Sequence, residues 1–257
     1  MHTHDPSSQA LEWFRVARSV VVLTDADMSA ESRMPVFGTD QMGSLTRHVP
    51  ATFDTEFMYR TNSEESWGWH LWRLAATRKV TPHAGHRALA LLATALPGLT
   101  VITPNIDDLH ERAGLSEVIH LRGCVFVARC MGCGHIAPDV DVPPYAADRT
   151  AVPVAPPRCP MCGDVVCPEV VRRDGVDRHT AWQQAGDKVR QCDLLIVVGT
   201  MKVDYPETSL PTLAQEHGAH VLEINPVRSK LSPLADLLWP TTAGHGLSLI
   251  HASVGMR

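Results

Sequence analysis

Three features are missing from this 257-residue sequence, and each absence narrows its function. No apolar run approaches the ~20 residues that a bilayer-crossing helix needs, so no membrane-spanning segment is expected. Positive charge is not in excess, because the formal net charge is −5, and neither nucleic acid nor an acidic membrane is an expected partner. The first ten residues have no apolar run behind basic ones, so we expect no secretory signal and a cytoplasmic location.

The composition that is present describes an ordinary globular protein. Hydrophobic residues make up 44% and charged residues 20% of the chain. A chain of this length suits one large domain, or a main domain with a small insertion.

Four of the seven cysteines form two C-x-x-C pairs, which is the spacing of a zinc site. Cys130 and Cys133 lie in CMGC, and Cys159 and Cys162 lie in CPMC. Such pairs let two thiolates bind one metal ion, and four of them predict one tetrahedral zinc per chain. Two disulfides are the alternative. Cys167 is close enough in sequence to be a spare ligand, although a buried free thiol is the simpler interpretation.

Apolar, β-branched runs alternate with helical patterns. The runs predict four buried parallel strands: SVVVLT (19–24), LTVITP (99–104), DLLIVVGT (193–200) and HVLEIN (220–225). Helical patterns occupy 83–96 and 207–218. This alternation predicts an α/β fold with a doubly wound, parallel, Rossmann-like sheet.

Two segments interrupt the predicted sheet. We expect a Rossmann-like domain at 1–45, 80–123 and 168–257, a tryptophan-rich helical excursion at 46–79, and a zinc-ribbon-like small domain at 124–167.

Five segments, in order along the chain, carry a resemblance to a known family. They are VVLTDADMSAES (21–32), TPNIDDLHERAG (103–114), VIHLRGCVFVARCMGCG (118–134), CDLLIVVGTMKVDYP (192–206) and EINP (223–226). With them, the chain from about Ser19 to Gly244 resembles a sirtuin, an NAD-dependent protein-lysine deacylase. The resemblance implies that the first segment is the nucleotide loop, the second holds the nicotinamide end, the third is catalytic, and the last two hold adenosine.

The sequence departs from the family pattern at the cofactor loop. Asp25-Ala26-Asp27 replaces Gly-Ala-Gly, and Val36-Phe37-Gly38 replaces Asp-Phe-Arg, which removes a cation near the cofactor. A carboxylate about 4 Å from a phosphate costs on the order of 4 kcal/mol at an effective dielectric near 20. Poor NAD binding in the family pose is therefore expected. The alternative is that Asp25 is a turn residue and Asp27 a helix cap.

The second departure concerns the catalytic base. In the family, the acyl oxygen attacks the nicotinamide ribose, nicotinamide leaves, and a histidine then accepts a ribose hydroxyl proton. Arg122 occupies the histidine position, and a guanidinium stays protonated. General-base catalysis is typically worth about 10²–10⁴-fold. We expect Arg122 either to bind an anion or to form a structural salt bridge, and both alternatives stay open.

Other family positions are retained. Asn105 and Asp107 match the residues that orient the nicotinamide carboxamide and ribose, and Thr200 and Asn225 match adenosine contacts. The alternative for the first pair is a set of loop-fixing hydrogen bonds. For Asn225 it is a turn at a strand end.

Substrate contacts match less well. VVRRDG (170–175) stands where the family has an aromatic-glycine substrate strand, so Val170 and Arg172 are the expected substrate residues. Sirtuins selective for acyl carboxylates carry Tyr-x-x-Arg before the next helix, and His70 and Arg73 stand at that place. A solvated helix face is the alternative for Arg73.

These departures favour a sirtuin-like protein that has lost the usual deacylation, and whether it is an enzyme at all stays open. Its ligand would be a small molecule or a protein in the cleft between the two domains. One alternative is an enzyme repurposed for a small polar metabolite. The other is a weak residual deacylase or NAD hydrolase. His48, His110 and His120 are candidates for a new proton-transfer group, and the alternative for each is a satisfied polar residue.

Overall fold

A six-stranded parallel sheet forms the larger part of the molecule. The computed structural model describes residues 6–34, 55–137, 152–171, 176–199 and 208–254. The strands of the main sheet are β1 (Val20–Thr24), β2 (Thr100–Thr103), β3 (Val118–His120), β6 (Leu194–Val198), β7 (His220–Ile224) and β8 (Leu237–Trp239). Their spatial order is β3-β2-β1-β6-β7-β8, the strand order of a Rossmann fold. The predicted doubly wound α/β sheet is confirmed.

The central strands were visible in the sequence because they are buried on both faces. Every residue of β1, β2 and β6 is buried, so each strand is a continuous apolar run rather than an alternating one. The edge strands β3 and β8 have only three residues each and are partly exposed. Our strand pattern did not include β8, because three residues are too few to show a period.

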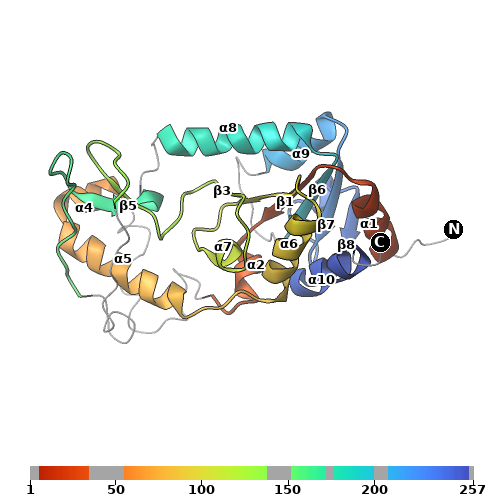
Figure 1. Cartoon of the computed structure of the whole chain (residues 1–257), viewed down its shortest axis with the longest axis horizontal. Coiled ribbons are helices and arrows are strands. Elements are labelled where there is room, and N and C mark those ends of the chain that lie inside the picture. Colours follow the sequence, from red (N-terminus) through yellow and green to blue (C-terminus); the bar gives the residue numbers. More distant parts are fainter. Residues whose placement is uncertain (1–5, 35–54, 138–151, 172–175, 200–207, 255–257) are drawn as a thin grey trace.

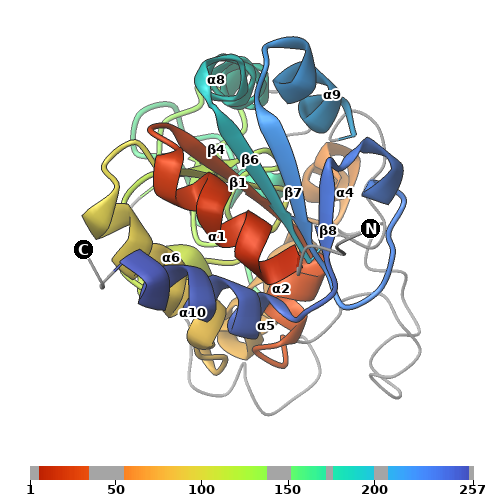
Figure 2. The ribbon, with the colours of Figure 1, turned by 90° about the vertical axis from the view of Figure 1, so that its right-hand side faces the viewer.

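Helices cover both faces of the sheet, as Figure 2 shows. The α-helices of the described residues are α1 (Pro6–Val16), α2 (Ala26–Ala30), α4 (Glu56–Thr61), α5 (Ser63–Arg78), α6 (Ala84–Ala95), α7 (Leu109–Arg112), α8 (Val176–Gln191), α9 (Ser209–Glu216) and α10 (Ala243–Val254). On one face, α1, α6 and α10 pack through residues such as Phe14, Leu89 and Leu247. On the other, α8 and α9 pack through Val189 and Leu210. None of the helices in these ranges combines the length and apolar character that crossing a bilayer requires.

A second, smaller unit lies at the far end of the molecule (Figure 1). Its two-stranded antiparallel sheet consists of β4 (Ala128–Cys130) and β5 (Val166–Pro168), followed by the short 3-10 helix η3 (Glu169–Val171). Its hydrophobic core is called the third core here, after the two cores on the two faces of the main sheet. The third core also includes Tyr59 of α4 and Trp67 and Leu71 of α5. The predicted helical excursion and the cysteine-bearing insertion therefore share one core. The exact domain boundaries stay a prediction.

The loops after β1 and β6 meet where the connections from the two strands turn to opposite sides. Gly199 follows β6 with φ of 64°, and a Cβ there would lie 2.6 Å from the Met28 backbone nitrogen. The Asp27 N–H donates to the Gly199 carbonyl over 3.2 Å. Only glycine lets the end of β6 approach the start of α2 this closely. In open α/β sheets, such a switch point is where ligands bind.

We expect Gly199→Ala to lower the free energy of unfolding by more than the cost of placing alanine at a positive φ, because its Cβ would also overlap the backbone of α2. A left-handed alanine costs about 1–2 kcal/mol, and overpacking typically adds about 1–3 kcal/mol. Gly218→Ala is the matched control, since Gly218 also has a positive φ, of 84°, but has open space where a Cβ would stand. Urea unfolding measures both free energies, and equal losses would contradict the close approach.

Candidate functional site

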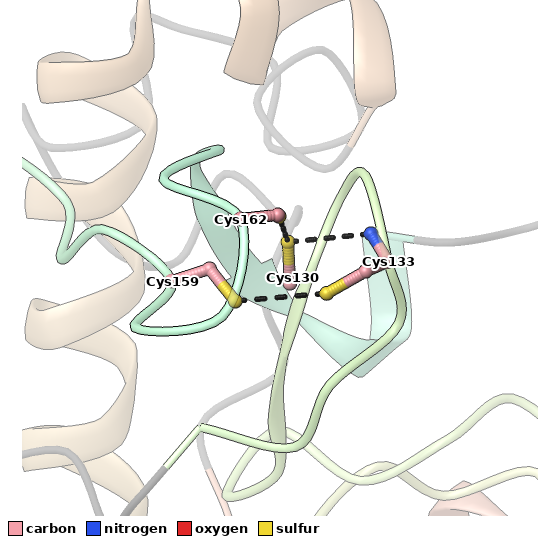
Figure 3. A group of neighbouring side chains, drawn as sticks. All are labelled: Cys130, Cys133, Cys159 and Cys162. Atoms are coloured by element: carbon pink, nitrogen blue, oxygen red, sulfur yellow. Dashed lines mark hydrogen bonds between the residues drawn. The ribbon is translucent and has the colours of Figure 1, made fainter.

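The four predicted metal ligands come together in the small unit (Figure 3). All four Sγ atoms lie within 4.8 Å of one another, with Cys130 and Cys162 3.3 Å apart and Cys133 and Cys159 3.6 Å apart. A tetrahedral zinc with bonds of about 2.3 Å would separate its sulfurs by roughly 3.8 Å. The four thiols are not disulfide-bonded, so the disulfide alternative is wrong. The cluster is consistent with a structural zinc.

Tight turns at both C-x-x-C pairs aim the sulfurs at a common point. The Gly134 N–H donates to the Cys130 carbonyl, and the Gly163 N–H donates to the Cys159 carbonyl, over 3.1 and 2.9 Å. Both glycines have positive φ. Cys167 is fully buried in the third core and is not one of the four.

A hydrogen-bond network occupies the switch point of the main sheet. The side-chain amide of Asn105 donates to the Asp25 carbonyl over 2.9 Å and to Ser29 Oγ over 3.0 Å. The Ser29 hydroxyl then donates to Asp107 Oδ2 over 2.8 Å. Burial raises the pKa of Asp107, and the bonds from Ser29 and Leu109 partly offset the rise. The sequence argument did not select Ser29, although it lies inside the quoted nucleotide-loop segment.

The predicted cofactor-loop residues lie at the start of α2. Asp25 is the N-cap residue, but its side chain makes no capping bond; its carbonyl accepts from Met28 N. The predicted helix-cap role of Asp27 is wrong, because Asp27 lies in the first turn of α2. Asp25 and Asp27 are half-buried and Ala26 is exposed.

Arg122 is exposed and lies beside the Asn105 loop. The residues around it bind this loop through their backbone, since Leu121 N donates to the Thr103 carbonyl and Val125 N to the Ile106 carbonyl, each over 2.8 Å. Gly123 follows with φ of 77°, and a Cβ there would lie 2.9 Å from Cγ of Glu169.

Glu169, which we did not select from the sequence, fixes the end of the segment (118–134) that is expected to be catalytic. Its carboxylate accepts from Cys124 N over 3.1 Å and from Arg129 Nε over 2.7 Å. These bonds tie the catalytic segment to the small unit.

Two of the three histidines proposed for proton transfer lie in this region. His110 is buried, its Nε2 is 2.9 Å from Thr24 Oγ1, and burial lowers its pKa to about 4. His120, at the end of β3, is 2.7 Å from Glu111 Oε1 and 2.8 Å from the Asn105 carbonyl. His48 lies outside the described residues.

The remaining site residues have different environments. Arg73 is only 2% exposed, so a solvated helix face is wrong; α5 is buried on all sides from Ser66 to Ala75. Val170 packs against the third core, and Asn225 is buried directly after β7. Phe37, Thr200 and Arg172 lie outside the described residues.

Known proteins match both the sequence and this geometry. The Sir2 family model matches residues 25–206. The chain belongs to the Sir2 family. It is 35% identical over 240 residues to an NAD-dependent protein deacylase of Corynebacterium glutamicum, covering 93% of this chain and 92% of that protein. A Pseudomonas aeruginosa NAD-dependent protein deacylase is 38% identical over 82% of this chain and 84% of its own.

A solved structure agrees. The crystal structure of a Sir2 homolog–NAD complex superposes with a TM-score of 0.82 at 31% identity, covering 97% of this chain and 94% of that one. The resemblance to sirtuins is thereby confirmed.

These relatives overturn our expectation that the chain has lost deacylase chemistry. Proteins that match it over most of its length are named NAD-dependent protein deacylases. The electrostatic argument assumed carboxylates held against phosphate, whereas Asp25 and Asp27 are half-buried. In bulk water the same repulsion is about 1 kcal/mol at 4 Å, so the cost falls below about 4 kcal/mol to the extent that these side chains contact solvent. The loop also forms its contacts to Asn105 and Gly199 through backbone atoms, which aspartate supplies as well as glycine.

We expect Cys133→Ala to abolish metal binding and to melt the small unit. Cys133 is exposed, so its loss removes a ligand without opening a cavity in the core. Metal-coupled folding then predicts loss of most zinc and a lower melting temperature. Cys167→Ala is the control, because it disturbs the buried core but should retain one zinc per chain by elemental analysis. Equal zinc content in both variants would contradict the assignment.

Proposed function

We propose that this chain is an NAD-dependent protein deacylase in which proton transfer is slow. The observation that carries the proposal is the Asn105–Ser29–Asp107 network, which joins the nucleotide loop to the expected nicotinamide loop at the switch point. The names of the relatives support it.

The residues at the switch point are compatible with NAD. When bound, NAD supplies the ribose that accepts the acyl group and the nicotinamide that departs. Asn105 and Asp107 would orient the nicotinamide end, and Asn225, directly after β7, would contact adenosine. By their family positions, Thr200 would also contact adenosine and Phe37 would contact the cofactor. The backbone of Asp25, Ala26 and Asp27 would face the diphosphate. Because both carboxylates are half-buried, they can remain in contact with water.

Arg122 cannot accept a proton in this reaction, since its guanidinium stays charged at any working pH. Its exposed position beside the Asn105 loop suits an electrostatic role toward the anionic cofactor. Without the family's base, the step that removes a ribose hydroxyl proton limits the rate.

Arg73 suits an acyl group that carries a carboxylate. It is a buried cation on α5, one turn before Thr77, whose carbonyl accepts from Arg112 Nη1 of α7 over 3.5 Å. Beside it, burial and the Arg73 charge hold the pKa of His70 well below its usual range, so His70 is a neutral neighbour. Val170 and Arg172 would contact the peptide. One structural zinc on the four cysteines completes the small unit.

The decisive experiment incubates the protein with NAD and an acyl-lysine peptide. We expect equal amounts of free nicotinamide and deacylated peptide, both measured by mass spectrometry. Nicotinamide without deacylated peptide would indicate an NAD hydrolase. If a zinc-loaded, cooperatively folding preparation releases neither product, the proposal fails.

We expect Arg122→His to raise kcat, because it places a titratable base where the guanidinium stood. General-base catalysis is worth about 10²–10⁴-fold, so a rise of at least about tenfold is expected from initial rates. Arg122→Gln, which removes the charge without adding a base, should give no such rise. An equal rise in both variants would show that charge, not proton transfer, limits the rate.

We expect Arg73→Met to change acyl preference, since methionine keeps an apolar stem but removes the cation. A hydrogen bond to a charged group is worth about 1.5–3 kcal/mol, so KM for a succinylated peptide should rise roughly ten- to a hundredfold. KM for the acetylated peptide should change by less than about twofold. Parallel changes for both peptides would contradict a carboxylate site, and the melting temperature checks that the variant folds.

A further inference from the structure

His120 is bonded through both ring nitrogens at the edge of the switch-point network. Its Nδ1 is 2.8 Å from the Asn105 carbonyl oxygen, and its Nε2 is 2.7 Å from Glu111 Oε1. A carbonyl oxygen can only accept a hydrogen bond, and an ionised carboxylate can only accept as well. Both nitrogens must therefore donate, and the ring in this geometry is an imidazolium.

Sheet register produces this arrangement. The parallel pairing of β2 with β3 sets His120 opposite Thr103, two residues before Asn105. The short helix α7, which follows the Asn105 loop, places Glu111 within hydrogen-bond distance of His120. The side chain of His120 is 12% exposed and that of Glu111 39%, so the pair is partly shielded from solvent. Charge-assisted bonds of this length are among the stronger hydrogen bonds in proteins.

The surrounding charges favour the imidazolium. Burial alone would lower the pKa of His120, but the bond and charge of Glu111, the Asn105 carbonyl and the Asp107 charge together raise it. Glu111 responds in the opposite sense: burial would raise its pKa, and the bond to His120 lowers it overall. Among the described residues, His110, Asp108 and Cys124 interact electrostatically with one or both members of the pair, and Arg112 is ion-paired with Asp108.

None of these four groups competes with His120 between neutral and mildly alkaline pH. Burial lowers the pKa of His110 to about 4 and raises that of Cys124 to about 12. Asp108 is ion-paired with Arg112 over 3.7 Å; burial raises the pKa of Asp108, and the Arg112 charge partly offsets the rise. The titration expected at this part of the site is therefore that of His120.

We propose that His120 is a positioning residue: its imidazolium holds the Asn105 carbonyl and the Glu111 carboxylate together, and NAD binding weakens when it loses a proton. The inference rests on the proposed use of NAD. A neutral imidazole has one N–H and cannot donate to both acceptors, so one bond is lost. Since the side chain of Asn105 bonds to Asp25 and Ser29, its displacement disturbs the whole network.

The direction of the pH dependence follows from the sign of the shift. A histidine with a raised pKa in the folded protein contributes its bonds fully below about pH 6.5, its ordinary pKa. That contribution is lost as pH rises through the folded-state value. We therefore expect KM for NAD to be low and constant below about pH 6.5 and to rise as the pH passes through the raised pKa of His120, while kcat changes less.

Three variants test the assignment. Glu111→Gln keeps an acceptor oxygen but removes the charge that supports the imidazolium, so the midpoint of the KM rise should move to lower pH. His120→Asn keeps a donor near the Nδ1 position, so it should retain a low KM at neutral pH and lose the pH dependence. His120→Gln places its donor near Nε2 instead, and KM should be raised roughly ten- to a hundredfold at neutral pH.

The measurement is KM and kcat against pH, with NAD affinity by calorimetry and the His120 ring followed by NMR titration. A flat KM in the wild type, or an unshifted midpoint in Glu111→Gln, would overturn the positioning role while leaving the deacylase proposal intact. Equal behaviour of His120→Asn and His120→Gln would do the same. If the wild type binds no NAD at any pH, the proposed function itself fails and this inference with it.

Discussion

The backbone contact between the loops after β1 and β6 is the constraint on which the site depends. Gly199 can lie against Asp27 and Met28 only because it has no side chain. This contact fixes the start of α2, and the Asp25 carbonyl there receives the Asn105 amide. From Asn105 the network extends to Ser29, Asp107, His120 and Glu111. A single close approach of two loops thereby organises both halves of the expected cofactor site.

The same constraint explains why the acidic loop misled the sequence argument. A sequence gives the identity of each side chain but not the contacts of the backbone. Two carboxylates at positions where the family has glycine therefore predict repulsion of a diphosphate. The contacts that shape this loop are made by backbone atoms, and φ of the Asp25 position, −144°, is an extended value open to any residue. Aspartate therefore costs less here than at a position that needs glycine, such as Gly199.

Local patterns were predictable and long-range pairings were not. The buried strands, α6 and the four cysteines each follow from residues within a few positions of one another. Trp67 and Leu71 of α5 belong to a core whose other members include Ala128 and Cys167, far along the chain, and no local pattern reveals such packing or the burial of Arg73 on the same helix. The His120–Glu111 pair depends on the register of β3 against β2 and on the return of α7. Short elements such as β8 have too few residues to show the hydrophobic period by which a strand is recognised in a sequence.

Helix α5 links the metal centre to the switch point. Trp67 and Leu71, in its first half and middle, belong to the same third core as Cys130 and Cys159. Its C-terminal turn reaches α7, where Thr77 accepts from Arg112. Because Arg112 lies on α7, which also carries Glu111, this bond joins the end of α5 to the helix beside the switch point. One helix thus connects the core that holds the four cysteines to the switch-point network, although the sulfurs belong to the other unit of the molecule.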